Sequence, residues 1–170
     1  RFGVPRLAFV NKMDRLGANF YRTIEMIVDR LGAQPVAIQM PIGAEAAFEG
    51  FVDLITMQEI VYSDDADVAP ETREIRAELK KDAAKRHATM VEVIAETDEA
   101  LTTKYLEGKE ISAKELMPAL RRATISGKLV PVLCGTALKN KGVRAVLDAV
   151  VDLLPSPIDI PAVRGILPDD

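Results

Sequence analysis

The sequence predicts an α/β fold, in which a parallel sheet is interrupted by an inserted α+β segment of short antiparallel strands and helices. Two apolar runs with strand character, Arg6–Val10 and Leu129–Cys134, are each followed by a polar loop and an amphipathic helix, as in βα units. The long stretch between them switches to short strands and charged helices. With 48% apolar and 28% charged residues, the 170-residue chain has the composition of a globular protein with a buried core.

The first βα unit has clear boundary signals. The strand Arg6–Val10 is followed by Asn19, a residue type that caps helix N-termini, and Gly32 provides a stop signal. Between these two residues, apolar side chains recur at helical intervals: Phe20, Ile24, Ile27, Val28 and Leu31. We therefore expect one helix from about residue 20 to residue 31.

The hydrophobic period changes at Pro35. Val36–Ile42, Phe51–Thr56 and Glu59–Tyr62 are predicted to be three short strands, and their closeness in sequence favours an antiparallel meander. The acidic segment Ser63–Asp67 is predicted to be a solvated loop and not a metal site, because runs of like charge usually face water.

A helical region follows the meander. A long helix is expected from about Pro70, with Glu71, Glu74 and Glu78 near the positive end of its dipole and an apolar stripe formed by Ile75, Leu79, Ala83, Met90 and Ile94. His87 falls on that stripe and is predicted to pack at the core edge. The chain has no second His, and no Cys or acidic pair is spaced to join His87 in a metal or catalytic site.

Two shorter helices complete the insertion. The first is expected from Asp98 to Leu106, and the second opens with the capping box Ser112–Glu115 and ends at Gly127.

The second βα unit begins at Leu129–Cys134. Pro131 cannot donate a ladder hydrogen bond, so it should lie at the strand start or on an unpaired side. The strand ends in the small-residue loop Gly135-Thr136-Ala137, and a final helix presents one apolar face and ends at Pro155.

Charge and cysteine content restrict the function classes. The net charge is −4, which excludes a global positive field for nucleic acid or anionic membrane, so no direct nucleic-acid site is evident. Cys134 is the single cysteine and cannot form an internal disulfide, and no apolar stretch is long enough to span a membrane. We expect a cytoplasmic protein. The first residues run straight into a strand, as though a preceding part of the domain had been removed.

The strongest functional motif is Asn11-Lys12-Met13-Asp14, which follows the first strand. In α/β sheets, ligands bind at the carboxyl ends of the strands. An Asp carboxylate offers two acceptor oxygens to the N1–H and N2–H₂ donors of guanine, a pairing that adenine cannot return. A Lys stem can lie along the flat face of a purine, and Asn11 can tie the loop to neighbouring backbone. The motif predicts guanine-base recognition by Asn11, Lys12 and Asp14.

The two βα units place two loops at the same end of the sheet. If their strands are parallel neighbours, the loop Gly135-Thr136-Ala137 meets Asn11–Asp14 over one ligand. The backbone N–H of Ala137 can then face guanine O6. Each mismatched contact would leave a buried polar group unpaired, at about 1–3 kcal/mol, so several contacts together separate guanine from adenine.

Several motifs together resemble bacterial elongation factor G, the ribosomal translocase. They are Val4–Arg15, Gly17–Phe20, Ile42–Glu45, Cys134–Val143 and Leu154–Pro157, and the resemblance extends over essentially the whole chain. It implies that Asn11, Lys12 and Asp14 form the guanine-specificity loop. It also implies that Gly135, Thr136 and Ala137 form the other base-contacting loop, where the family usually has Ser in place of Thr136.

The resemblance also implies a domain organisation. Residues 1–33 and 129–156 would form the C-terminal half of a P-loop GTPase-type parallel sheet. Residues 34–128 would be its inserted subdomain, whose helices face the ribosomal stalk protein. Residues 157–170 would lead into a following β-barrel domain. The implied activity of the intact protein is GTP hydrolysis coupled to tRNA and mRNA translocation on the ribosome.

One expected element is absent from the sequence, which contains no Gly-x-x-x-x-Gly-Lys-Ser/Thr motif. Such a loop cradles the phosphates of GTP or GDP and places a hydroxyl on Mg²⁺, so we expect Mg²⁺ to be held by a missing N-terminal half. The chain alone is predicted to be inactive, and its sheet should have an exposed apolar edge.

Two other readings of the sequence stay open. The isolated chain could be a protein-binding module that recruits the stalk protein without binding nucleotide. The parent could also be a related ribosome-protection or peptide-release GTPase, although Met13 and Gly17–Phe20 disfavour this reading.

Overall fold

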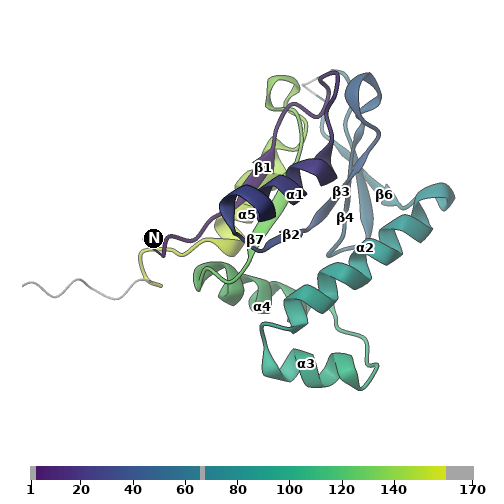
Figure 1. The fold of residues 1–170 in the computed structure, drawn as a ribbon. Coiled ribbons are helices and arrows are strands. Elements are labelled where there is room, and N and C mark those ends of the chain that lie inside the picture. Colours follow the sequence, from purple (N-terminus) through teal and green to yellow (C-terminus); the bar gives the residue numbers. More distant parts are fainter. Residues whose placement is uncertain (1–2, 66–67, 160–170) are drawn as a thin grey trace, which may run out of the picture.

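The computed structural model describes residues 3–65 and 68–159, and in this part of the chain strands and helices form two sheets with helices packed around them (Figure 1). The strands are β1 (Ala8–Val10), β2 (Pro35–Ala37), β3 (Gln39–Ile42), β4 (Gly50–Asp53), β5 (Gln58–Val61), β6 (Glu71–Glu74) and β7 (Val130–Cys134). The helices are α1 (Phe20–Leu31), α2 (Ala77–Ala95), α3 (Glu99–Leu106), α4 (Ala113–Ile125) and α5 (Val143–Leu153), with 3₁₀ turns η1 (Glu45–Ala47) and η2 (Ala137–Lys139).

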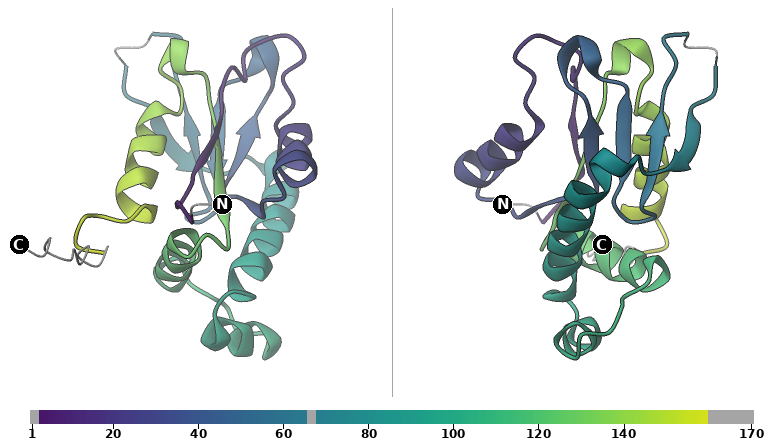
Figure 2. Two further views of the ribbon diagram at one scale, coloured as in Figure 1. Left: turned by 60° about the vertical axis from the view of Figure 1, so that its left-hand side comes forward. Right: turned by 90° about the vertical axis from the view of Figure 1, so that its right-hand side faces the viewer.

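The two predicted βα units are parallel neighbours in a three-stranded sheet of order β1-β7-β2. β1 pairs with β7 in the register Ala8↔Val132, and β2 pairs with β7 in the register Pro35↔Val130. Helices α1 and α5 lie on opposite faces of this sheet (Figure 2). The α/β fold class with an inserted antiparallel segment is therefore confirmed. Among the described residues β1 pairs only with β7, so one edge of the sheet is open.

Pro131 lies second in β7 and fits the predicted position at the strand start. The N–H of Val130 donates toward the β2 side, to the Gln34 carbonyl. The nitrogen of Pro131 therefore faces β1, whose pairing begins only opposite Val132, so no ladder bond is lost.

The second sheet is the predicted antiparallel meander, with the order β3-β4-β5-β6. The prediction of a single strand over Val36–Ile42 was wrong, because the run divides between the sheets. β2 joins the parallel sheet and β3 joins the meander. Ile38 connects them: its N–H donates to Val132 of β7, and its carbonyl accepts from Leu54, just after β4. Apart from Gln39, the run is apolar in both sheets, and its hydrophobic pattern does not mark the point where it divides.

The predicted start of the long helix near Pro70 was also wrong. Glu71–Glu74 form β6, which pairs with β5, and helix α2 begins at Ala77. The reason is a contact distant in sequence. The side chain of Glu59 on β5 is fully buried and accepts hydrogen bonds from the Arg73 side chain and from both the backbone N–H and the side chain of Arg76. These bonds hold the segment before α2 against the meander.

The other helices follow their local signals. Asn19 caps α1, Gly32 ends it in the left-handed conformation, Asp98 caps α3, and the capping box Ser112–Glu115 opens α4. His87 is half-buried, and its Nδ1 lies 2.7 Å from the Leu54 carbonyl oxygen, in agreement with a packing role.

Candidate functional site

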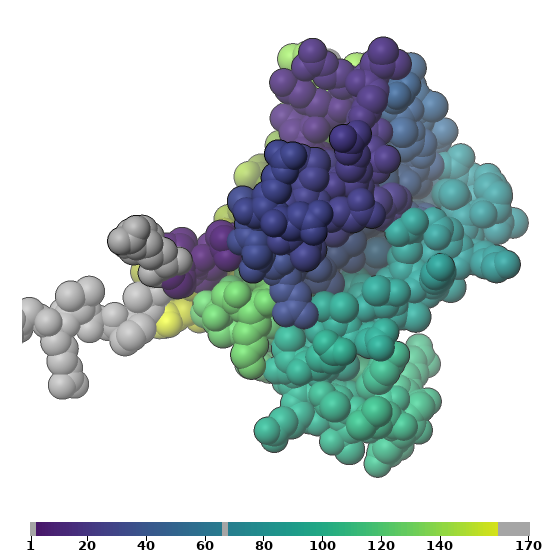
Figure 3. Space-filling model, in the orientation of Figure 1, coloured from purple at the N-terminus to yellow at the C-terminus, as the bar shows by residue number. Residues whose placement is uncertain are grey.

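Four connections gather at the carboxyl end of the parallel sheet. The loops after β1 and β7 lie there, together with the β3–β4 and β5–β6 connections of the meander, at the top of Figure 1. In the space-filling view, purple atoms of the first loop form this end of the molecule, with green atoms of the second loop behind them (Figure 3). Helix α3 lies at the opposite end (Figure 1).

The structure brings the two predicted loops into direct contact through Asn11. Its Oδ1 accepts hydrogen bonds from the backbone N–H of Ala137 at 3.0 Å and from that of Lys12 at 2.8 Å. The N–H of Met13 donates to the Gly135 carbonyl at 3.0 Å, and the N–H of Gly135 donates to Val10 at 3.1 Å. Lys12 has a φ of 63°, so its backbone turns sharply here and its side chain is exposed.

Asp14 is half-buried beside the second loop. A hydrogen bond from the side chain of Thr136, which is almost completely buried, is the main cause that holds the pKa of Asp14 below its ordinary value. The ammonium group of Lys139, 3.2 Å from Oδ2, acts in the same direction. Asp14 is therefore an ionised acceptor beside the second loop. Elongation factor G, which the sequence resembles, usually has Ser at the position of Thr136, and Thr136 also carries a hydroxyl group.

The N–H of Ala137 is placed differently from the prediction. It was expected to face O6 of a guanine, but it donates to Asn11, because the 3₁₀ turn η2 begins at Ala137 and directs this N–H across to the first loop. A base could accept from it only by sharing or replacing that bond.

Sequence reasoning missed two contacts from the meander. Glu45, in the β3–β4 connection, donates its N–H to the Met13 carbonyl and accepts the Gly17 N–H with its side chain. Asp64, in the β5–β6 connection, pairs with the buried ammonium group of Lys141. Glu45 belongs to a motif noted in the sequence without a role. No local signal marks Asp64.

A cavity of about 240 Å³ adjoins the first loop on the side of α1. Asn11 and Lys12 line it, but neither Asp14 nor Gly135, Thr136 or Ala137 does, so it is not the space between the two loops.

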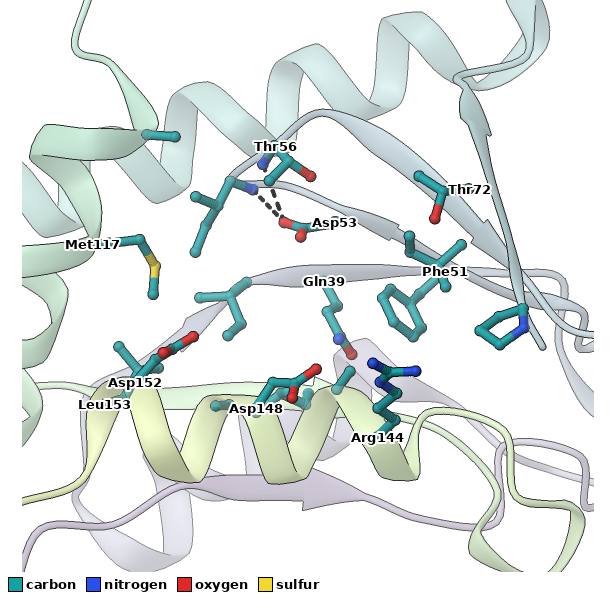
Figure 4. Close-up of a pocket in the computed structure, with 18 of the residues that line it drawn as sticks. Gln39, Phe51, Asp53, Thr56, Thr72, Met117, Arg144, Asp148, Asp152 and Leu153 are labelled. Carbon is teal, nitrogen blue, oxygen red and sulfur yellow. Dashed lines mark hydrogen bonds between the residues drawn. The ribbon is translucent and has the colours of Figure 1, made fainter.

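A larger cavity of about 750 Å³ lies between α5 and the meander, away from the predicted site residues (Figure 4). Arg144, Asp148 and Asp152 extend from α5 toward it, opposite Phe51 and Asp53. Most of its lining is apolar, and none of the predicted base-contacting residues takes part.

The described residues offer no other kind of site based on a metal ion or a membrane-spanning helix. Within residues 3–65 and 68–159, no group of three or more His, Cys, Asp or Glu side chains could hold a metal ion. In the same residues no helix combines the length and apolar character needed to cross a membrane.

Comparison with known proteins gives a family for this chain. A crystal structure of a protein from Thermus thermophilus superposes with a TM-score of 0.79 at 29% sequence identity, over 92% of this chain and 23% of the Thermus chain. The chain thus spans about a quarter of that relative. Residues 1–156 match the family model described as the elongation factor Tu GTP binding domain. The chain belongs to the family of translation-factor GTPases defined by that domain.

Proposed function

We propose that this chain is the guanine-recognition part of an elongation factor G-type GTPase, which promotes tRNA and mRNA translocation on the ribosome. The observation that supports this most directly is the contact between the two loops, in which Asn11 accepts a hydrogen bond from the Ala137 N–H and Asp14 pairs with Lys139. Family membership supports GTP hydrolysis as the class of reaction. The motif Asn11–Asp14 supports guanine as the base that is recognised.

The chemistry of these residues fits a guanine nucleotide. The ionised, half-buried carboxylate of Asp14 would accept from N1–H and N2–H₂, and a base would displace the exposed Lys139 from it. The stem of Lys12 would cover one face of the purine. Asn11 would act by joining Gly135, Thr136 and Ala137 to the first loop.

GTP or GDP with Mg²⁺ is the proposed cofactor. Because the sequence has no Gly-x-x-x-x-Gly-Lys-Ser/Thr motif, the phosphate and Mg²⁺ contacts would come from another part of the complete GTPase. We propose that this chain alone binds GDP weakly and does not hydrolyse GTP.

The chain is proposed to have three parts with separate roles, and β2 (Pro35–Ala37), at the start of the second part, pairs with β7 in the parallel sheet. Residues 1–33 and 129–156 would carry the base site, residues 34–128 would form an insertion that faces the ribosomal stalk protein in the cytoplasm, and residues 157–170 would lead to the next domain. Residues 160–170 lie outside the described part of the chain.

Titration with nucleotides tests the base assignment. The ¹⁵N-labelled chain is titrated with GDP, ADP and XDP, and amide shifts are followed by NMR. GDP should perturb Asn11–Gly17 and Gly135–Lys139, while ADP should not. Asp14→Asn should favour XDP, whose C2 carbonyl accepts from the new amide, and should weaken GDP by about 2–4 kcal/mol.

A matched control is Asp29→Asn on the exposed side of α1, which should leave all three titrations unchanged. Equal GDP affinity in the wild type and Asp14→Asn would remove Asp14 from its assigned role.

A second candidate for the isolated chain is a protein-binding module without nucleotide binding. It is supported by α3, which projects at the end opposite the loops and exposes Leu106 (Figure 1). Separate titrations with stalk protein and GDP distinguish the two functions: a module of this kind would bind only the protein.

A further inference from the structure

We propose that the antiparallel sheet holds both base-reading loops in their binding geometry, with Glu45 and Asp64 as the positioning residues. This inference rests on the proposed guanine recognition and goes beyond it, because it makes the affinity for the base depend on a sheet that does not contact the base.

Glu45 contacts the first loop on both sides of Asp14. Its backbone N–H donates to the Met13 carbonyl at 2.9 Å, and its Oε1 accepts from the backbone N–H of Gly17 at 2.8 Å. Asp14 lies between these two contacts in the chain. These contacts constrain the backbone of Asp14 relative to the β3–β4 connection, and not only relative to β1.

The backbone of the connection that carries Glu45 is closely constrained. Glu45 has a φ of 56°, an unfavourable conformation for a residue with a Cβ atom, and it is held by hydrogen bonds within η1 and by the buried ring of Phe48. Gly43 has a φ of 71°, and a Cβ atom there would lie 1.9 Å from the Ala47 carbonyl oxygen. A turn so closely constrained can transmit the position of the meander to the loop.

Asp64 reaches the second loop through Lys141. The Lys141 side chain is only 6% exposed, and its Nζ lies 2.9 Å from the Asp64 carboxylate. The backbone of Lys141 donates to and accepts from that of Thr136 at 3.1 and 2.9 Å. Thr136 lies in the second loop, so Asp64 is linked to that loop through Lys141. Since Asp64 is 97% exposed, we expect it to contribute less than Glu45.

The topology explains why both contacts occur at one place. In a meander, the β3–β4 and β5–β6 connections leave the same end of the sheet, and here that end adjoins the carboxyl ends of β1 and β7 (Figure 1). Linkage requires the effect to be reciprocal: if the meander favours base binding, a bound base stabilises the contacts of Glu45 and Asp64.

The experiment uses the ¹⁵N-labelled chain and compares Glu45→Ala, Glu45→Gln and Asp64→Asn with Glu49→Gln. Glu49 lies in the same connection as Glu45 but pairs with Arg76, so it is the matched control. Three quantities are measured for each variant: GDP affinity, hydrogen exchange at the Gly17 amide, and the thermal midpoint. The last of these identifies any variant that fails to fold.

Glu45→Ala should weaken GDP binding about tenfold and speed exchange at Gly17, because the loop loses an acceptor. Glu45→Gln keeps an amide oxygen and should retain most of both properties, Asp64→Asn should show a smaller loss, and Glu49→Gln should match the wild type. If Glu45→Ala kept the GDP affinity and the Gly17 exchange rate of the wild type, the inference about the meander would be overturned, but the proposed function would not. Absence of GDP binding by the wild type would overturn the proposed function, and with it the dependence of base binding on the meander.

Discussion

The side-chain oxygen of Asn11 accepts a hydrogen bond from the backbone N–H of Ala137 at 3.0 Å, across 126 positions of sequence. The same oxygen accepts the N–H of Lys12, so both neighbours are donors and the amide orientation is determined by them. Asn11 therefore joins the two loops. In the proposed function Asp14 would read the base, and Asn11 would set the relative position of the two loops.

Asn11→Ala should lower the free energy of unfolding by about 1–2 kcal/mol, because two backbone N–H groups lose their acceptor. Urea denaturation followed by circular dichroism measures the change. Asn11→Asp keeps an acceptor oxygen at this position and should remain closer to the wild type. Equal stability of Asn11→Ala and the wild type would mean that water replaces both bonds without cost.

Glu59→Ala should destabilise the fold by about 2–3 kcal/mol, since the carboxylate joins β5 to β6 and to the start of α2. Burial by itself raises the pKa of Glu59, but hydrogen bonds from the Arg76 backbone and from the Arg73 and Arg76 side chains lower it below the ordinary value. The side chains of Arg73 and Arg76 are partly exposed, so water can solvate them when the carboxylate is removed, which limits the loss of stability.

The control for Glu59 is Glu74→Ala on β6, whose side chain is exposed and should cost little. Urea denaturation of both variants gives the comparison. A loss for Glu74→Ala as large as that for Glu59→Ala would locate the effect in β6 itself and not in the buried carboxylate.

The elements that could be predicted are those whose signals lie within a few residues. Asn19 and Gly32 bound α1, and Ser112 and Glu115 open α4, because capping is a local hydrogen-bonding requirement. The start of α2 could not be predicted in this way. The residue at the N-cap position is Arg76, which makes no side-chain capping bond. Glu59, which holds this start, lies far away in the sequence.

The candidate site also combines features that the sequence predicts with features that it does not. The meeting of the two loops could be predicted, because parallel neighbouring strands end at the same edge of a sheet. The engagement of the Ala137 N–H by Asn11, and the contacts of Glu45 and Asp64, depend on how the meander packs against that edge. Hydrophobic period and motif spacing carry no information about such packing.

Gly43→Ala should destabilise the protein by at least about 2 kcal/mol, because it combines a positive φ with a collision against the backbone of Ala47. Gly108→Ala is the matched comparison. Gly108 has a similar φ of 69°, but a Cβ atom there meets nothing within 4 Å, so only the conformational cost of about 1 kcal/mol is expected. Thermal denaturation of the two variants separates the collision from the backbone cost, and equal losses would contradict the assignment.

Glu115 provides the pH-dependent prediction. Hydrogen bonds from Lys104 and then from Ser112 lower the pKa of Glu115 from 4.5 to about 2. A carboxyl whose pKa falls on folding contributes stability that is fully present above its unfolded pKa of 4.5 and is lost as the pH falls toward about 2. Glu115→Gln should therefore be less stable than the wild type at pH 7, and the difference should shrink steadily below pH 4.5, where the wild type alone loses this contribution.

Urea denaturation between neutral and acidic pH measures the difference, with the exposed Glu110→Gln as a control that should follow the wild type throughout. A difference that stays constant across this range would show that Glu115 acts through helix capping independent of its charge.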